Sequence, residues 1–316
     1  ARQFMEIILL GNVVTHLYLG LNAVLRASGH PKQAMYATIA TVAINTILAP
    51  IFIFMFDWGI RGAAIATVSA QVIALLWQLK QFNNANELLH FRRGIFRLKR
   101  KIVFDSLAIG MSPFLMNLAA CLIVILINQG LKKYGGDLAI GAFGIVNRLV
   151  FIVVMIVMGL NQGMQPIAGY NFGAKLYDRV NKVLKLTIIY ATCVTTFGFL
   201  VGMLAPNLVV GIFTSDAELT ELSATGLRIT VMFFPIIGFQ MVTSNFFQSI
   251  GMAGKAIFLS LTRQMLILLP CLLILPHFFG VAGVWYSMPV SDLLASLIAL
   301  VMLVYQFRKF KTAAAH

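Results

Sequence analysis

The sequence predicts an all-α protein whose helices cross a membrane many times. Its composition points that way: 60% of the 316 residues are hydrophobic, only 11% are charged, and the mean hydropathy is +0.90. Soluble domains carry about 25% charged residues. Long apolar runs with short connections fill almost the whole chain. In hydrocarbon no water can satisfy free backbone groups, so such runs must be helices.

Nine apolar runs follow one another, and each predicts one membrane-spanning helix. A helix rises about 1.5 Å per residue, so about 20 residues cross the roughly 30 Å of hydrocarbon. Each run has about this length or exceeds it. In order, the runs occupy residues 4–25, 34–56, 60–79, 103–131, 139–165, 186–213, 222–250, 256–276 and 281–306.

The formal net charge of +14 is spread unevenly over the connections. Lys and Arg concentrate in every second connection, including segment 80–101 and the connection to which we assign Lys255 and Arg263. The alternate connections and the N-terminus contain few of them: Arg2, Arg61, Lys132 and Lys133. Cytoplasmic loops carry an excess of basic residues. We therefore expect the basic connections and the C-terminus to be cytoplasmic, and we expect no nucleic-acid partner.

The sequence does not support an enzyme or a metal site. Its three cysteines lie inside apolar runs, and no pair has the spacing of metal ligands. The histidines are scattered, and neither a Ser/His/Asp arrangement nor a phosphate-binding glycine loop is present. We expect no catalytic residue, no resident metal and no cofactor other than a coupling ion.

The chain contains a partial repeat of itself. Residues 26–34 (RASGHPKQA) align with residues 248–256 (QSIGMAGKA), and residues 59–63 (GIRGA) align with residues 280–284 (GVAGV). The aligned glycines are offset by 222 and 221 positions. A nearly constant offset across three helices matches the first three runs with the last three.

Both sets of three begin on the same side of the membrane, so the repeats are parallel. Parallel repeats occur in transporters whose halves are related by an axis along the membrane normal. The three middle runs lack a counterpart, so we expect three further helices upstream of Ala1 and twelve spans in two pseudo-symmetric lobes. The expected parts are half of the N-lobe, a basic cytoplasmic linker, the C-lobe and a tail or tag remnant, at residues 1–82, 83–101, 102–310 and 311–316.

Five short motifs stand out along the chain: residues 159–175 (GLNQGMQPIAGYNFGAK), 25–32 (LRASGHPK), 62–67 (GAAIAT), 226–229 (GLRI), and Asn45 followed by 50–52 (PIF). These motifs resemble those of the multidrug and toxic compound extrusion (MATE) family. They run in the family's order over essentially the whole chain, which is similar to the family from its fourth helix onward. The bacterial DinF/MepA-like branch is the more similar one.

The resemblance implies a secondary antiporter that exports amphipathic, often cationic compounds in exchange for Na⁺ or H⁺. Two lobes would rock about a central cavity to give alternating access. The resemblance also implies a multi-pass protein of the bacterial cytoplasmic membrane. Its expected partners are membrane lipid and small molecules, and we expect a monomer.

A coupling-ion site is implied by two residues that match family positions, Asn45 and Thr67. In the bacterial branch these positions lie beside an acidic residue on a helix that this chain does not include. Amide and hydroxyl oxygens suit Na⁺ but need a carboxylate for charge balance. Alternatively, the two residues only hydrogen-bond between helices. Ala49 stands where many relatives carry an Asp before the proline, which leaves the ion type open.

Asp292 is the candidate for proton coupling in the C-lobe. Like Glu6 and Asp105, it is interpreted as lying near the start of a helix. The alternative there is that the carboxylate stabilises the helix dipole at the membrane interface.

The substrate cavity is expected on the helices that contain Pro113 and Pro235. Proline removes one helix hydrogen bond and permits bending, which alternating access can use. The candidate cavity residues are Asn117, Gln240, Asn245, Met116 and Met241. The alternative for each is ordinary packing or lipid contact.

Two alternatives to a drug antiporter stay open from the sequence. A lipid-linked glycan flippase of the same superfamily would need a strongly cationic cavity, whereas only Arg148 and Arg228 lie deep inside the apolar runs. A chain without the upstream helices could also be a non-transporting remnant. The coding sequence before Ala1 and an efflux assay would separate these functions.

Overall fold

The computed structural model describes residues 2–83, 90, 94 and 99–314, which are helical almost throughout and contain no β-strand. The chain divides into two compact units, unit 1 (Ala1–Lys99) and unit 2 (Arg100–His316). Among the described residues, six helices are long and apolar enough to cross a membrane, and a bent pair of shorter helices makes a seventh span. The predicted all-α membrane fold is confirmed. Most of the expected linker, 83–101, lies outside the described residues.

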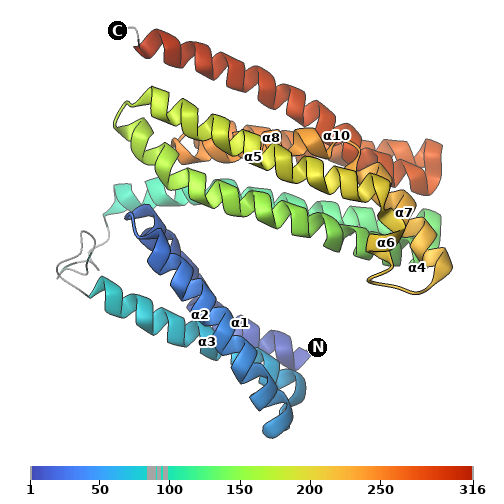
Figure 1. Cartoon of the computed structure of the whole chain (residues 1–316), viewed down its shortest axis with the longest axis horizontal. Coiled ribbons are helices and arrows are strands. Elements are labelled where there is room, and N and C mark those ends of the chain that lie inside the picture. The colour runs from blue at the N-terminus through green and yellow to red at the C-terminus, as the bar shows by residue number, and fades with distance from the viewer. Residues whose placement is uncertain (1, 84–89, 91–93, 95–98, 315–316) are drawn as a thin grey trace. The chain divides into compact units, whose positions relative to one another are not determined.

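Unit 1 is a bundle of three helices (Figure 1). Helix α1 spans Arg2–Ala27, α2 spans Pro31–Pro50 and continues as the π-helical segment η1 (Ile51–Met55), and α3 spans Gly59–Phe82. Pro31 occupies the first turn of α2, where its missing N–H would have no partner in any case.

Polar side chains join the helices of unit 1. Thr15 Oγ1 on α1 donates a hydrogen bond to Gln71 Oε1 on α3 over 2.6 Å. Asn22 Nδ2 on α1 donates to Thr38 Oγ1 on α2 over 3.2 Å. Hydrogen bonds of this kind hold membrane helices together where the hydrophobic effect cannot.

Unit 2 contains the longest helices of the chain. Its elements are α4 (Arg100–Gly173), α5 (Tyr177–Leu204), α6 (Pro206–Val210), α7 (Ala217–Val231), α8 (Phe234–Ser249), α9 (Ala253–Leu261), the π-helical η2 (Thr262–Leu268) and α10 (Leu269–Ala314). Both α4 and α10 contain one glycine with non-helical dihedrals, Gly136 (φ 67°) and Gly280 (φ 55°). When α4 and α10 are divided at these glycines, the spans of the described residues correspond to the nine apolar runs.

The expected break at Pro235 is present. Helices α7 and α8 meet at an angle of 55°, and Pro235 lies in the first turn of α8. Asp216 directly precedes helix α7, and its side chain accepts the Leu219 N–H over 3.0 Å and so caps the helix.

The aligned glycines of the repeat share the same backbone conformation. Gly29 and Gly251 have φ of 88° and 76°, and Gly59 and Gly280 have φ of 51° and 55°. Residues other than glycine rarely adopt such positive φ angles, so glycine is favoured at these helix ends. The first three runs and the last three therefore turn in the same way.

A second pair of aligned glycines permits close helix contact. A Cβ atom on Gly62 would lie 2.5 Å from the carbonyl oxygen of Phe52, and one on Gly283 would lie 2.4 Å from that of Leu275. No side chain fits at such distances without moving a backbone. The repeat is therefore present in the packing as well as in the sequence.

Candidate functional site

Unit 2 contains a cavity of about 240 Å³. It lies among α4, α5, α7, α8, η2 and α10, and most of its lining is aliphatic or aromatic, including Ile123, Val150 and Phe234. Binding sites for drug-sized ligands usually measure about 300–1,000 Å³. This cavity therefore suits a small molecule or one end of a larger one.

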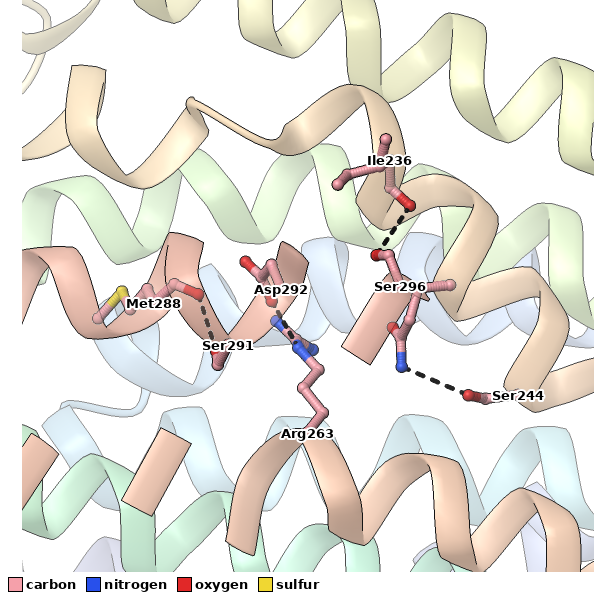
Figure 2. Close-up of polar contacts among 8 residues, drawn as sticks. Ile236, Ser244, Arg263, Met288, Ser291, Asp292 and Ser296 are labelled. Carbon is pink, nitrogen blue, oxygen red and sulfur yellow. Dashed lines mark hydrogen bonds and ion pairs between the residues drawn. The ribbon is translucent and has the colours of Figure 1, made fainter. Parts of the chain in front are cut away.

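One ion pair stands in the apolar wall. Arg263 Nε donates to Asp292 Oδ1 over 2.7 Å, and both residues line the cavity (Figure 2). The Asp292 side chain is 5% exposed, and the Arg263 side chain is 32% exposed. A charge inside a membrane protein is costly unless it is paired. Each of these charges is the other's partner.

The structure corrects two placements from the sequence. Arg263 lies inside the π-helical η2 and not in a loop. Asp292 lies about three turns beyond Gly280 and not near a helix start, and its partner is a guanidinium and not a helix dipole. A charge inside the apolar run 256–276 was the signal that could have placed Arg263 correctly.

Further polar groups of this wall were missed by the sequence analysis. Gln264 also lines the cavity, and its Oε1 is buried without a hydrogen-bond partner in the described structure. Ser291, which precedes Asp292, uses its hydroxyl to donate to the Met288 carbonyl over 2.7 Å (Figure 2). Gln264 belongs to the same π-helical segment as Arg263, and such segments are frequent at functional sites.

Of the five expected cavity residues, Met241 lines this cavity and the other four do not. Met116 is half-buried on α4, and Asn117 is exposed, with its amide donating to the Pro113 carbonyl over 2.8 Å. Their contribution to a substrate site stays a prediction.

Gln240 and Asn245 lie on α8 outside the lining of the cavity. Gln240 is buried, and its Nε2 lies 3.5 Å from Ser244 Oγ. Asn245 donates to the Met241 carbonyl over 2.9 Å and accepts from Gln165 Nε2 over 3.4 Å. Both side chains therefore join turns or helices within unit 2, and a role toward substrate stays a prediction.

In unit 1 the structure brings Asn45 and Thr67 together. Asn45 Nδ2 on α2 donates to Thr67 Oγ1 on α3 over 3.0 Å, and the Thr67 hydroxyl donates to the Ala63 carbonyl over 3.0 Å. Asn45 Oδ1 makes no hydrogen bond within the described structure, and no carboxylate there bonds either side chain. The pair therefore adds another hydrogen bond between the helices of this bundle, which agrees with the alternative interpretation of these two residues.

Comparisons with known proteins agree with this architecture. The family model MatE matches residues 109–273, which is just over half of the chain. The multidrug export protein MepA of Staphylococcus aureus (strain MSSA476) is 28% identical over 310 residues, covering 97% of this chain and 67% of that protein. MepA of Staphylococcus haemolyticus (strain JCSC1435) shows the same identity and coverage.

Two solved structures are also similar. The MATE multidrug transporter DinF-BH is 34% identical, with a TM-score of 0.88 over 98% of this chain and 69% of that one. A MOP superfamily transporter from Pyrococcus furiosus has a TM-score of 0.91 at 22% identity, over 98% and 70% of the two chains, and supports the fold alone. The family model, the relatives and the repeated helices all agree, and the chain belongs to the MATE (MatE) family of integral membrane transporters.

Proposed function

We propose that this chain is part of a secondary antiporter that exports small amphipathic cations in exchange for Na⁺ or H⁺. The observation that carries the proposal is the apolar cavity of unit 2 with one buried ion pair in its wall, in a chain whose relatives are named multidrug exporters. An apolar pocket with few polar groups accepts varied amphipathic compounds, and a carboxylate favours cationic ones.

Two places are proposed for the coupling ion. In unit 1, Asn45 Oδ1 and the remaining lone pair of Thr67 Oγ1 offer hard oxygen ligands for Na⁺. In unit 2, Asp292 is the buried carboxylate proposed to exchange a proton, and within the described part of the chain its charge is paired with Arg263. Either ion would change the charge of a helix interface and so bias one conformation of its lobe.

The proposed orientation places the basic connections and the C-terminus in the cytoplasm. The correction at Arg263 removes one cation from that side, but the remaining imbalance of Lys and Arg keeps its direction. A reporter enzyme that is active only outside the cytoplasm can be fused after residue 310. Activity of this fusion would contradict the proposed orientation.

Efflux from cells tests the function. We would express the intact gene, with whatever coding sequence precedes Ala1, in a pump-deficient bacterium and measure ethidium efflux under an imposed Na⁺ or proton gradient. Efflux that follows one gradient supports antiport and names the ion. Absence of efflux under both gradients contradicts drug export.

Two substitutions test the proposed ion sites. Thr67→Val removes a ligand and should abolish stimulation by Na⁺, whereas the matched control Thr46→Val removes a hydroxyl that bonds only its own helix, to Val42 O over 2.9 Å. Asp292→Asn should abolish stimulation by the proton gradient. If Thr67→Val behaves like Thr46→Val, the proposed Na⁺ site is wrong.

A further inference from the structure

We propose that the cavity of unit 2 binds the protonated amine of a small amphipathic compound through Asp292 and Gln264, and that Arg263 is a tethered cation that competes for the same carboxylate. The inference rests on the proposed function and deepens it, because it names a substrate subsite and the chemical group that the subsite recognises.

The first step concerns hydrogen-bond acceptors that have no donor in the cavity wall containing Gln264 and Asp292. Gln264 Oε1 is buried and lacks a hydrogen-bond partner in the described structure. The ion pair occupies Asp292 Oδ1 and leaves Oδ2 without a hydrogen bond to any described residue. Both residues line the cavity. An ammonium group donates up to three hydrogen bonds, so it could bond Asp292 Oδ2 and also the enclosed Gln264 Oε1 once the Gln264 side chain turns toward the cavity.

The second step is that Arg263 binds the Asp292 carboxylate weakly. Arginine can grip a carboxylate with two parallel hydrogen bonds, but here Nε alone makes one contact with Oδ1. The Arg263 side chain is also about one third exposed, so its long stem can carry the guanidinium away from the carboxylate. An arriving ammonium can therefore replace the guanidinium, and Asp292 never stands unpaired in an apolar wall.

The third step is the shape of the remaining surface. Ile123, Val150, Phe234, Ile237 and Met241 provide an apolar wall for the body of the ligand. The volume of about 240 Å³ limits that body to a compact group or to the amine end of a longer amphipath. Charge and shape together select a lipophilic amine.

The repeat supplies an independent comparison. With the offset of 221 residues, Asp292 aligns with Gln71 of unit 1. With the offset of 222 residues, Arg263 aligns with Thr41. Gln71 is neutral and bonds neutral Thr15. The helical framework that the two units share therefore does not require an ion pair at these positions. The two charges instead reflect a function that is specific to unit 2.

The experiment measures binding to the purified chain by isothermal titration calorimetry in detergent. Three probes share one apolar body and differ in the polar group: adamantan-1-amine, adamantan-1-ol and adamantane-1-carboxylate. We expect the amine to bind at least tenfold more tightly than the alcohol, and the carboxylate to bind more weakly still. Tightest binding of the carboxylate, or equal binding of the amine and the alcohol, would overturn the proposal.

Variants locate the binding. Asp292→Asn should weaken amine binding at least tenfold, and Arg263→Gln should strengthen it several-fold because the competitor is gone. The matched control Asp105→Asn makes the same chemical change on exposed α4 surface outside the cavity and should bind like the original chain. Unchanged amine binding in Asp292→Asn would refute the site.

The double variant Arg263→Gln/Asp292→Asn serves as the decisive measurement if the single variants fold poorly, since it leaves no unpaired charge. It should bind the amine and the alcohol equally, and a retained amine preference would overturn the proposal. Ethidium export tests the proposed function separately. Amine binding that depends on Asp292 supports the subsite even without export, whereas export without amine binding refutes the subsite alone.

Discussion

Adding a single methyl group to Gly62 or Gly283 should destabilise the bundle that contains it. Each glycine lies where one helix crosses the backbone of the preceding span. The added Cβ would lie 2.5 Å from Phe52 O or 2.4 Å from Leu275 O, whereas ordinary contacts begin at 3.4 Å. The helices must therefore separate by about 1 Å, because a backbone carbonyl, unlike a side chain, cannot rotate away.

The magnitude follows from two opposing effects. Overpacking costs about 1–3 kcal/mol, and a backbone obstacle places these sites toward the upper end. Alanine is a better helix former than glycine by about 1 kcal/mol, which offsets part of that cost. We expect a net loss of about 1–2 kcal/mol for Gly62→Ala and for Gly283→Ala alike, since the two sites have the same geometry.

Hydrogen–deuterium exchange in detergent is the appropriate assay, because it resolves stability by segment. Gly62→Ala should increase exchange in α1 to α3, and Gly283→Ala should do so in unit 2. The control is Gly163→Ala on α4, where a Cβ meets nothing within 4 Å and exchange should stay equal or fall. If both variants match the control, the close helix contacts are not as described.

Three further outcomes follow from the polar contacts. Arg263→Gln leaves the Asp292 carboxylate buried and unpaired and should lower the free energy of unfolding by about 3–5 kcal/mol. The double variant with Asp292→Asn should lower it far less, and thermal unfolding of unit 2 compares the two variants. Asp216→Ala removes the cap of α7 and should cost about 1 kcal/mol, seen as faster amide exchange in the first turn of that helix. A double-mutant cycle of Thr15→Val and Gln71→Leu should give a coupling energy of about 0.6 kcal/mol, and a value near zero would mean that their hydrogen bond contributes nothing.

Much of the candidate ion site in unit 1 could be foreseen from sequence. The family motifs named Asn45 and Thr67, and the structure brings their side chains within 3.0 Å of each other. The site in unit 2 was foreseen only in part. Asp292 was named, but Arg263 was assigned to a loop, because a charge count along the chain cannot distinguish a charge at a helix end from one that is paired inside a helix.

The fold class and the repeat were determined by the sequence alone. A hydrocarbon layer forces every apolar run of sufficient length into a helix, and glycines offset by 221 or 222 residues mark turns that only glycine makes easily. The cavity and its ion pair were decided by tertiary structure. Arg263 and Asp292 are 29 residues apart and lie on different spans. They meet only because the turn at Gly280 and the packing of η2 against α10 place both side chains in one wall.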